Sequence, residues 1–204
     1  MRKLIIASNN EGKCKEIKDL LVDLPFCVLS LKDIGLGIQV DEDQDTFEGN
    51  ATKKASEIMK ASGEIALADD SGLEVDALDG KPGVYSAMFA GIGASDEENY
   101  SKLLTLLKGI PPERRKASFH CVIAVAYPDG RIILVNESCD GYITFSPAGN
   151  NGFGFDPIFV PDNYEKTFAQ LGKEVKNLIS HRGKAMQKIK QMLNQECKQD
   201  GSVE

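Results

Sequence analysis

The stretch KLIIASNNEGK, residues 3–13, indicates the fold class because it changes from strand to helix patterning within a few residues. The apolar run at residues 3–7 is typical of a short buried strand, and residues 8–10 supply polar side chains of the kind that cap helices. The predicted helix ends at Pro25. Its apolar face, with three- and four-residue spacing, consists of Ile17, Leu20, Leu21 and Leu24.

Strand and helix patterns continue to alternate along the chain. Strands are predicted at residues 26–31 and 64–68, the second ending directly in residues 69–72 (DDSG). Asp45 with Glu48 resembles a capping box for a helix that buries Ala51, Ala55, Ile58 and Met59, and Ser95 with Glu98 caps another helix through about Lys108.

The last third of the chain predicts a hairpin and a final helix. Residues 118–127 and 131–139 are apolar on both faces and flank a Pro-Asp-Gly turn, so this hairpin is expected to lie centrally. A short strand should follow residues 149–157, and residues 183–197 form a helix with Met186, Ile189 and Leu193 facing inward. We therefore expect one mixed α/β domain over residues 1–204, frayed at its last few residues.

Composition excludes several classes of protein. The chain has 204 residues, of which 42% are hydrophobic, enough for one sizeable core. It contains no run of about eighteen apolar residues, and its start turns polar at Ser8, so we expect a cytoplasmic protein without a membrane partner. The net charge of −7 disfavours a nucleic-acid partner, although a small phosphate ligand needs only a few local cations.

The cysteines do not form a metal or redox motif. The 5 cysteines are odd in number, lie far apart and include no CxxC pair. They are therefore predicted to be reduced and mostly buried thiols.

Residues 8–13 (SNNEGK) join a strand to a helix N-terminus, where free N–H groups and the helix dipole attract anions. Lys13 adds a positive charge, and Gly12 allows close approach of the backbone to a phosphate. An ordinary solvated cap is an equally good interpretation of this segment alone. A Walker loop is excluded because Ala7 stands where that motif needs glycine.

The adjacent carboxylates of Asp69 and Asp70 follow a buried strand and repel one another unless a cation or donors compensate them. Magnesium would do so, with one Asp binding metal and the other accepting a proton from water. The alternative is that one Asp caps the following turn. The acidic loop at residues 41–45 is either a solvated segment or the source of a further ligand, Asp41 or Glu42.

Two later segments carry groups suited to a purine. Residues 152–157 (GFGFDP) combine flexible backbone and aromatic faces with an acceptor, or else form a tight aromatic turn. Lys176 and residues 180–182 (Ser-His-Arg) offer donors for a base or a phosphate, although charge runs are usually solvated. His120, inside an apolar strand, is expected to be a core or edge histidine.

Taken together, these motifs resemble those of the inosine triphosphate pyrophosphatase family, whose bacterial members act on ITP, dITP and XTP. The matching segments are residues 8–13 (SNNEGK), Thr46-Phe47 with Asn50-Ala51 and Lys53, residues 68–72 (ADDSG), 82–87 (PGVYSA), 152–157 (GFGFDP) and 179–183 (ISHRG). The resemblance covers almost the whole chain. It implies a mixed α/β fold with an elongated central sheet flanked by helices, two lobes with an active-site cleft between them, and a homodimer.

The resemblance also implies a role for each site residue. Asp70 would be the proton acceptor and a Mg²⁺ ligand, with Asp69, Asp41 and Glu42 completing the metal site. The residues that would bind the purine nucleoside triphosphate are Ser8, Asn9, Asn10, Glu11, Gly12, Lys13, Lys53, Ser71, Phe153, Gly154, Phe155, Asp156, Lys176, His181 and Arg182.

Phe155 and Met88 depart from the family's usual residues, as does the loop DEDQD, which leaves the choice between Asp41 and Glu42 open. Two other functions compete with this one. One is a different hydrolase, such as a dUTP pyrophosphatase or a general nucleotide phosphatase, and the other is a non-enzymatic nucleotide sensor.

Overall fold

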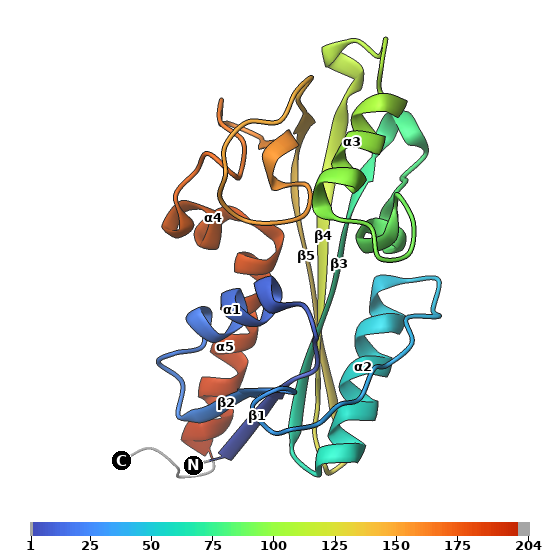
Figure 1. Ribbon diagram of the computed structural model, residues 1–204. Coiled ribbons are helices and arrows are strands. Elements are labelled where there is room, and N and C mark those ends of the chain that lie inside the picture. Colours follow the sequence, from blue (N-terminus) through green and yellow to red (C-terminus); the bar gives the residue numbers. More distant parts are fainter. Residues whose placement is uncertain (1, 200–204) are drawn as a thin grey trace. The chain divides into compact units, whose positions relative to one another are not determined.

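The structure is a computed structural model that describes residues 2–199, shown in Figure 1. The predicted fraying of the last residues lies outside the described residues. The strands are β1 (Arg2–Ile6), β2 (Phe26–Ser30), β3 (Ile65–Val75), β4 (Lys116–Ala126), β5 (Ile132–Ile143) and β6 (Phe159–Pro161). The helices are α1 (Glu11–Leu20), α2 (Phe47–Ser62), α3 (Asp96–Leu106), α4 (Lys173–Ile179) and α5 (His181–Gln199), with short 3-10 turns η1 (Asp76–Leu78), η2 (Gly83–Met88), η3 (Pro112–Arg114) and η4 (Asp156–Ile158).

The strands form one mixed sheet in the order β2-β1-β3-β4-β5-β6. The strand β1 pairs in parallel with both β2 and β3, and β5 pairs antiparallel with β6. The predicted class, a mixed α/β fold with a central sheet flanked by helices, is confirmed. The chain divides into two compact units, residues 1–70, 121–137 and 183–204 in the first and residues 71–120 and 138–182 in the second.

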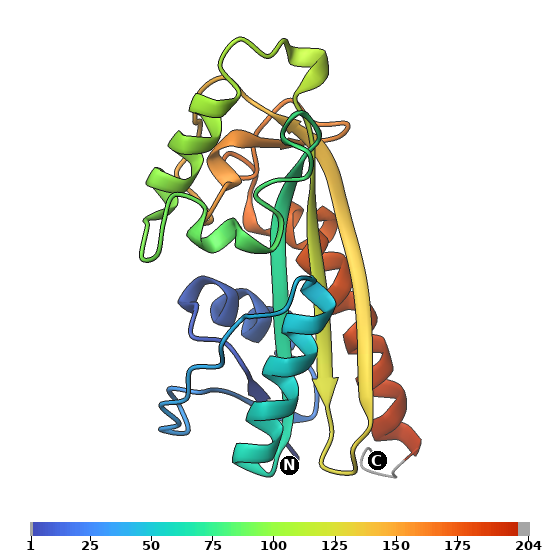
Figure 2. The same ribbon diagram turned by 90° about the vertical axis from the view of Figure 1, so that its right-hand side faces the viewer.

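In the first unit, helices cover both faces of the strands (Figures 1 and 2). Alternate residues of β1, β3 and β4 pack with Ile17 of α1 and with Met186, Ile189 and Leu193 of α5. The intervening residues of the same strands pack with Ala51, Ala55 and Ile58 of α2. This alternation follows from the two-residue period of a strand, and it sends consecutive side chains to opposite helical layers.

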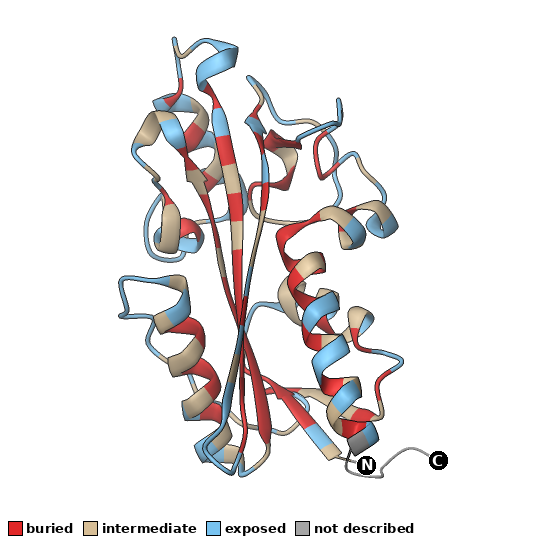
Figure 3. Cartoon of the chain, turned by 180° about the vertical axis from the view of Figure 1, so that it is seen from behind, coloured by how far each residue is buried: buried red, intermediate tan, exposed pale blue. Residues whose placement is uncertain are grey.

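The second unit has its own apolar core. Leu73 and Val75 of β3 pack there with Leu103 of α3 and with aromatic residues, among them Phe119, Phe159 and Phe168. The rings of Phe119 and Phe159 pack edge to face, with their centres 4.7 Å apart. Figure 3 shows how burial alternates with exposure along the helices.

Several local predictions were wrong in an informative way. The strand β3 does not end before Asp69 but continues to Val75, because the two carboxylates point to opposite faces and each meets a lysine. The helix α2 is capped by Thr46, whose hydroxyl accepts from the Gly49 amide, and not by Asp45. Ser95 and Glu98 form the predicted capping box.

The two strands of the hairpin differ in burial. The strand β4 is buried along most of its length, as predicted, whereas β5 has exposed residues along much of one face. The final helix starts at His181, two residues before the predicted start, and α4 was not predicted. All five cysteines are free thiols, three of them buried, which confirms the prediction. Between residues 2 and 199, no helix is both long and apolar enough to cross a membrane.

Candidate functional site

The side chains of Asp69 and Asp70 point to opposite faces of β3. Their strand neighbours Leu67 and Ala68 already belong to different core clusters, one packed on α1 and α5 and the other on α2. Asp69 accordingly meets Lys13 of α1, and Asp70 meets Lys54 of α2. Adjacent carboxylates are tolerated in one buried strand because the pleat separates them and supplies each with its own cation.

Asp70 is buried, with one carboxylate oxygen hydrogen-bonded and the other without a hydrogen-bond partner among the described residues. Its Oδ1 accepts from Lys54 Nζ at 2.7 Å. Its Oδ2 is buried and has no hydrogen-bond partner among residues 2–199. Burial raises the pKa of Asp70 above its usual range, against the opposing attraction of Lys54 and Lys13. A carboxylate of this kind is suited to accept a proton or bind a cation.

Lys54 is the functional lysine that sequence reasoning missed. Its Nζ donates to Glu42, to Asp70 and to the backbone carbonyl of Asp69, at 2.7, 2.7 and 2.9 Å. Burial favours the neutral amine, but the attraction of Asp70 and Glu42 outweighs it and raises the pKa of Lys54. The side chain is therefore a fixed, charged link between two carboxylates.

Lys53, which the family motif assigns to the triphosphate, pairs with a different carboxylate. Its Nζ pairs with Asp43 at 2.8 Å, on an exposed part of the surface. Successive helical residues point about 100° apart, so only one of two adjacent lysines on α2 faces the sheet. The apolar positions of α2 identify that one: Lys54 shares the buried face with Asn50, Ala51, Ala55 and Ile58.

The acidic loop contributes Glu42 to the group. Glu42 is the loop carboxylate that meets Lys54, whereas the Asp41 side chain is exposed. Between the two candidates left open by the sequence, the geometry therefore favours Glu42 as a companion of Asp70.

Asp69 is held on both oxygens. Lys13 Nζ lies 2.6 Å from Oδ1, and the thiol of Cys121 on β4 donates to Oδ2 at 3.1 Å. The side chain of Asp69 is fully buried, while that of Lys13 keeps 15% of its surface exposed. Local sequence patterns could not predict the contact of Cys121 with Asp69, because the two residues are 52 positions apart in the chain.

The loop at residues 8–13 is built as a helix start. Asn10 is the N-cap of α1, and its side chain accepts from the Lys13 amide at 2.9 Å. Ser8 Oγ accepts from the Asn10 amide, and Asn9 donates to the carbonyl of Ile38. The side chain of Glu11 is exposed and lies 3.7 Å from Lys32 Nζ. The loop, α1 and Lys13 thus supply N–H groups and a cation suited to phosphate oxygens.

Asp156 and Lys176 form the centre of a second group of candidate residues, which lies in the second unit. Lys176 Nζ lies 2.6 Å from Asp156 Oδ2, and both side chains are buried. The same oxygen accepts from the Phe153 amide at 2.9 Å. Gly152 is required here, because a Cβ at that position would lie 2.0 Å from Asp156 Oδ2 and its φ is +78°.

Aromatic and cationic groups surround Phe153. Lys176 Nζ and the Arg182 guanidinium lie 4.9 and 5.4 Å from the centre of its ring. Arg182 also donates to Ser71 Oγ at 2.8 Å, and His181 stacks on Phe119 with ring centres 4.6 Å apart. Phe155, by contrast, packs into the core of the unit, so its ring is not offered to a ligand. Gly154 donates its amide to Asp96.

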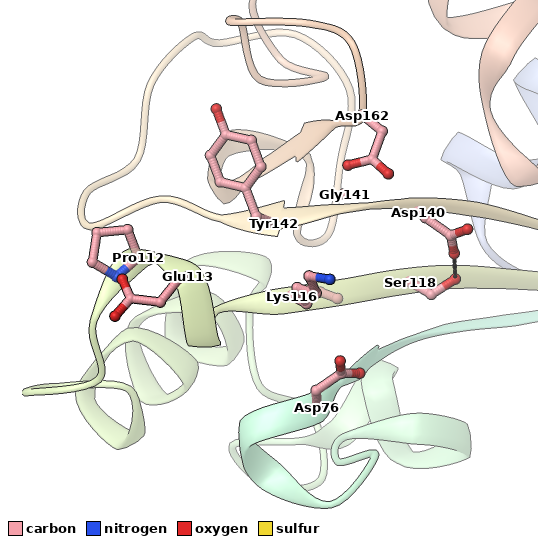
Figure 4. A pocket seen from close by; sticks show the side chains of 10 residues that line it. Asp76, Pro112, Glu113, Lys116, Ser118, Asp140, Gly141, Tyr142 and Asp162 are labelled. Atoms are coloured by element: carbon pink, nitrogen blue, oxygen red, sulfur yellow. Dashed lines mark hydrogen bonds between the residues drawn. The ribbon is translucent and has the colours of Figure 1, made fainter.

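A separate pocket in the second unit does not fit a nucleotide (Figure 4). It has a volume of about 400 Å³, and Lys116 and Tyr142 line it together with the carboxylates Asp76, Glu113, Asp140 and Asp162. Ser118 donates to Asp140 on its wall at 2.7 Å. A triphosphate would be repelled by this acidic wall.

Asp70 and Glu42 fit a hard divalent cation. Both offer carboxylate oxygens, and the Oδ2 of Asp70 is buried without a hydrogen-bond partner in the described chain. Residues 2–199 contain no group of three or more His, Cys, Asp or Glu side chains arranged to hold a metal. This donor set suits Mg²⁺, which binds one or two carboxylates and completes its shell with water and substrate phosphates.

Known proteins resemble this chain over nearly its full length. A family model described as the Ham1 family matches residues 4–192. A dITP/XTP pyrophosphatase of Desulforamulus reducens is 51% identical, covering 94% of this chain and 96% of that protein. One from Clostridium perfringens is 48% identical, covering 95% and 98%.

Solved structures of similar proteins share the fold. The Ham1 protein of Staphylococcus aureus has a TM-score of 0.85 and 41% identity, covering 96% of this chain and all of that one (100%). A HAM1 protein from Coxiella burnetii has a TM-score of 0.86 and 38% identity, with the same two coverages. The family resemblance drawn from the sequence motifs is confirmed.

Proposed function

Since the chain belongs to the Ham1 family, we propose that it is a pyrophosphatase that hydrolyses the non-standard purine nucleoside triphosphates ITP, dITP and XTP to the monophosphate and pyrophosphate. The relatives' names, dITP/XTP pyrophosphatase, support the substrate class and the reaction.

The surroundings of Asp70 carry this proposal. A buried carboxylate with a raised pKa, one oxygen held by Lys54 and the other without a hydrogen-bond partner in the described chain, is prepared to take a proton from water. A nucleotide sensor needs no such base. Asp70 is therefore assigned as the general base for attack of water on the α phosphorus.

We assign Asp70 and Glu42 as the residues that hold Mg²⁺, with Asp69 and Asp41 outside the inner group. When bound, Mg²⁺ neutralises phosphate charge and lowers the pKa of water. Lys54 keeps the two carboxylates together, at 2.7 Å from each, and offsets their repulsion.

Lys13 and the start of α1 are assigned to the leaving pyrophosphate. An ammonium and free helix N–H groups bind the β and γ phosphate oxygens of the bound substrate and keep hold of them as pyrophosphate leaves. Asp69 Oδ1, 2.6 Å from Lys13 Nζ, holds this cation on the α1 side of β3.

The purine is assigned to the second unit. Phe153 offers a ring face beside Lys176, while Arg182 and His181 supply N–H donors for the 6-keto oxygen that inosine and xanthine share. Adenine presents an amino group at that position, so the donors would lose their partner, and a buried site of this kind discriminates strongly. Ser71, bonded to Arg182 at 2.8 Å, directly follows Asp70 in β3 and so links the two groups through the chain.

A panel of nucleotides tests the proposal. Pyrophosphate release is measured for ITP, XTP, dITP, ATP, GTP and dUTP, with Mg²⁺ and with excess chelator. We expect rapid Mg²⁺-dependent release from ITP, XTP and dITP and slow release from the other three. Preference for dUTP, or orthophosphate as the first product, would assign the chain to another class of nucleotide hydrolase.

A further inference from the structure

Cys121 meets the site from the middle of β4, where the other side chains on its face are apolar. Its neighbours on that face, Ile123 and Val125, pack in the core between the strands and the helices α1 and α5. The Cys121 side chain is fully buried, and its thiol donates to Asp69 Oδ2 at 3.1 Å. The Cys121 thiol is thus a hydrogen-bond donor from the apolar core to the buried Asp69 carboxylate.

Lys13 and Cys121 each contact one oxygen of the Asp69 carboxylate. Lys13 holds Oδ1 through a charged contact of 2.6 Å, and Cys121 holds Oδ2. Rotation of the carboxylate would break one or both contacts. Loss of a donor to a buried carboxylate oxygen is costly, so the thiol favours the orientation in which Asp69 faces Lys13.

We propose that Cys121 is a positioning residue, whose thiol orients Asp69 and through it fixes the Lys13 ammonium for the triphosphate. This inference rests on the proposed function. An ammonium has three donors, so Lys13 keeps donors for phosphate oxygens while one is held by Asp69. A lysine has a long flexible stem, and a fixed partner reduces the entropy that phosphate binding would otherwise cost.

The inference separates the roles of the two aspartates. Asp70 acts on water, whereas Asp69 acts on Lys13 and so on phosphate binding. Loss of the thiol should therefore weaken substrate binding and leave the Mg²⁺ requirement unchanged.

Three cysteine variants test the inference by steady-state kinetics with ITP. Cys121→Ala removes the donor, Cys121→Ser keeps one, and Cys197→Ala removes a buried thiol from the same core cluster without touching Asp69. We expect Cys121→Ala to raise KM about fivefold, as loss of one weak hydrogen bond would, with kcat changed by less than about twofold. Cys121→Ser should stay within about twofold of the wild type, and Cys197→Ala should leave KM unchanged.

Thermal unfolding and the Mg²⁺ concentration for half-maximal rate are measured on the same proteins. Both alanine variants should lose stability, because each removes a buried side chain. A rise in KM in Cys121→Ala alone would therefore show that Cys121 positions Asp69 in addition to packing in the core. If Cys121→Ala and Cys197→Ala have the same KM, Cys121 only fills space. A raised Mg²⁺ requirement with an unchanged KM in Cys121→Ala would also overturn the inference.

Infrared spectroscopy tests the contact without any activity. The S–H stretching band that disappears in Cys121→Ser belongs to Cys121, and a hydrogen bond to a carboxylate shifts it to lower frequency. In Asp69→Asn this band should move toward the frequency of an unbonded thiol, and a band that stays in place contradicts the contact. If the wild type fails to hydrolyse ITP, the proposed function fails, but this measurement still decides whether Cys121 holds Asp69.

Discussion

Lys53 and Lys54 are adjacent in sequence and differ in almost every physical respect. Lys54 is buried and held by two carboxylates and a carbonyl, whereas Lys53 pairs with Asp43 at the surface. Exposed ion pairs contribute little, but removing one partner from a buried charged group leaves the others uncompensated. The two positions therefore form a matched pair for mutation.

Lys54→Met should lower kcat/KM for ITP by about 100-fold or more, because it removes a preorganised charge from the site. Lys53→Met should change it by less than about threefold, since an exposed pair is worth little. Steady-state kinetics on both purified variants gives the comparison. Equal losses would show that Lys54 has no special place beside Asp70.

The pH profile of Lys54→Met should also change. Burial raises the pKa of Asp70, and Lys54 and Lys13 oppose that shift while Glu42 adds to it. A base acts only when deprotonated, so activity is lost as the pH falls through its pKa, and a raised pKa moves this loss to higher pH. Removing Lys54 removes the largest opposing attraction.

The acid limb of kcat/KM is therefore expected at higher pH in Lys54→Met than in the wild type, measured at a fixed saturating concentration of free Mg²⁺. The profile of Lys53→Met should coincide with that of the wild type. A limb that moves to lower pH, or does not move, would count against Asp70 as the group that titrates.

At the scale of single elements, the turn at residues 152–156 depends on one glycine. Gly152 and Gly154 both have positive φ, +78° and +61°. A Cβ on Gly152 would lie 2.0 Å from Asp156 Oδ2, whereas one on Gly154 would meet nothing within 4 Å. Because Gly152 has no side chain, Asp156 Oδ2 can lie against it and pair with Lys176. The glycine therefore supports the second group of site residues.

Gly154→Ala should destabilise the fold by about 1 kcal/mol, the cost of a left-handed conformation for a residue with a side chain. Gly152→Ala should cost about 2 kcal/mol more, because the added methyl group also displaces the Asp156 carboxylate. Urea denaturation of the two variants and the wild type measures the difference. Equal free energies of unfolding would show that Asp156 moves aside without penalty.

Local sequence patterns predict some of the helices and strands but not others. A continuous apolar run predicts β1, apolar periodicity predicts α1 and α2, and the Ser95 capping box is predictable because its two partners are three residues apart. The predicted strand at residues 64–68 is too short, because two adjacent carboxylates are unusual in a buried strand. Their tertiary partners Lys13 and Lys54 explain why β3 continues through them. Local patterns also could not decide between Lys53 and Lys54, or connect Cys121 with Asp69, since each choice depends on which face meets the sheet.

At the scale of the molecule, the family resemblance drawn from the sequence implies a homodimer, and the second unit has three exposed apolar side chains close together in the sequence. We call Tyr85, Met88 and Ile92 the η2 patch, and their side chains are 57%, 42% and 97% exposed. Exposed aromatic and large aliphatic side chains within one short segment are a feature that protein interfaces use. We propose that a second copy of the chain covers this patch.

Sedimentation at micromolar concentration should give twice the mass of the chain for the wild type and for Val22→Glu, a control at another exposed apolar side chain. The double variant Met88→Glu with Ile92→Glu should sediment as a monomer, because it places charges in the interface. A dimer that persists in the double variant would place the interface elsewhere, and a monomeric wild type would contradict the homodimer.

Isotope labelling shows directly whether water attacks the α phosphorus and pyrophosphate leaves, as the roles of Asp70 and Lys13 require. ITP is hydrolysed in ¹⁸O-labelled water, and the two products are separated and weighed by mass spectrometry. We expect one labelled oxygen in the inosine monophosphate and none in the pyrophosphate. A label in the pyrophosphate, or labelled orthophosphate as the first product, would show attack at another phosphorus and would contradict the roles assigned to Asp70 and Lys13.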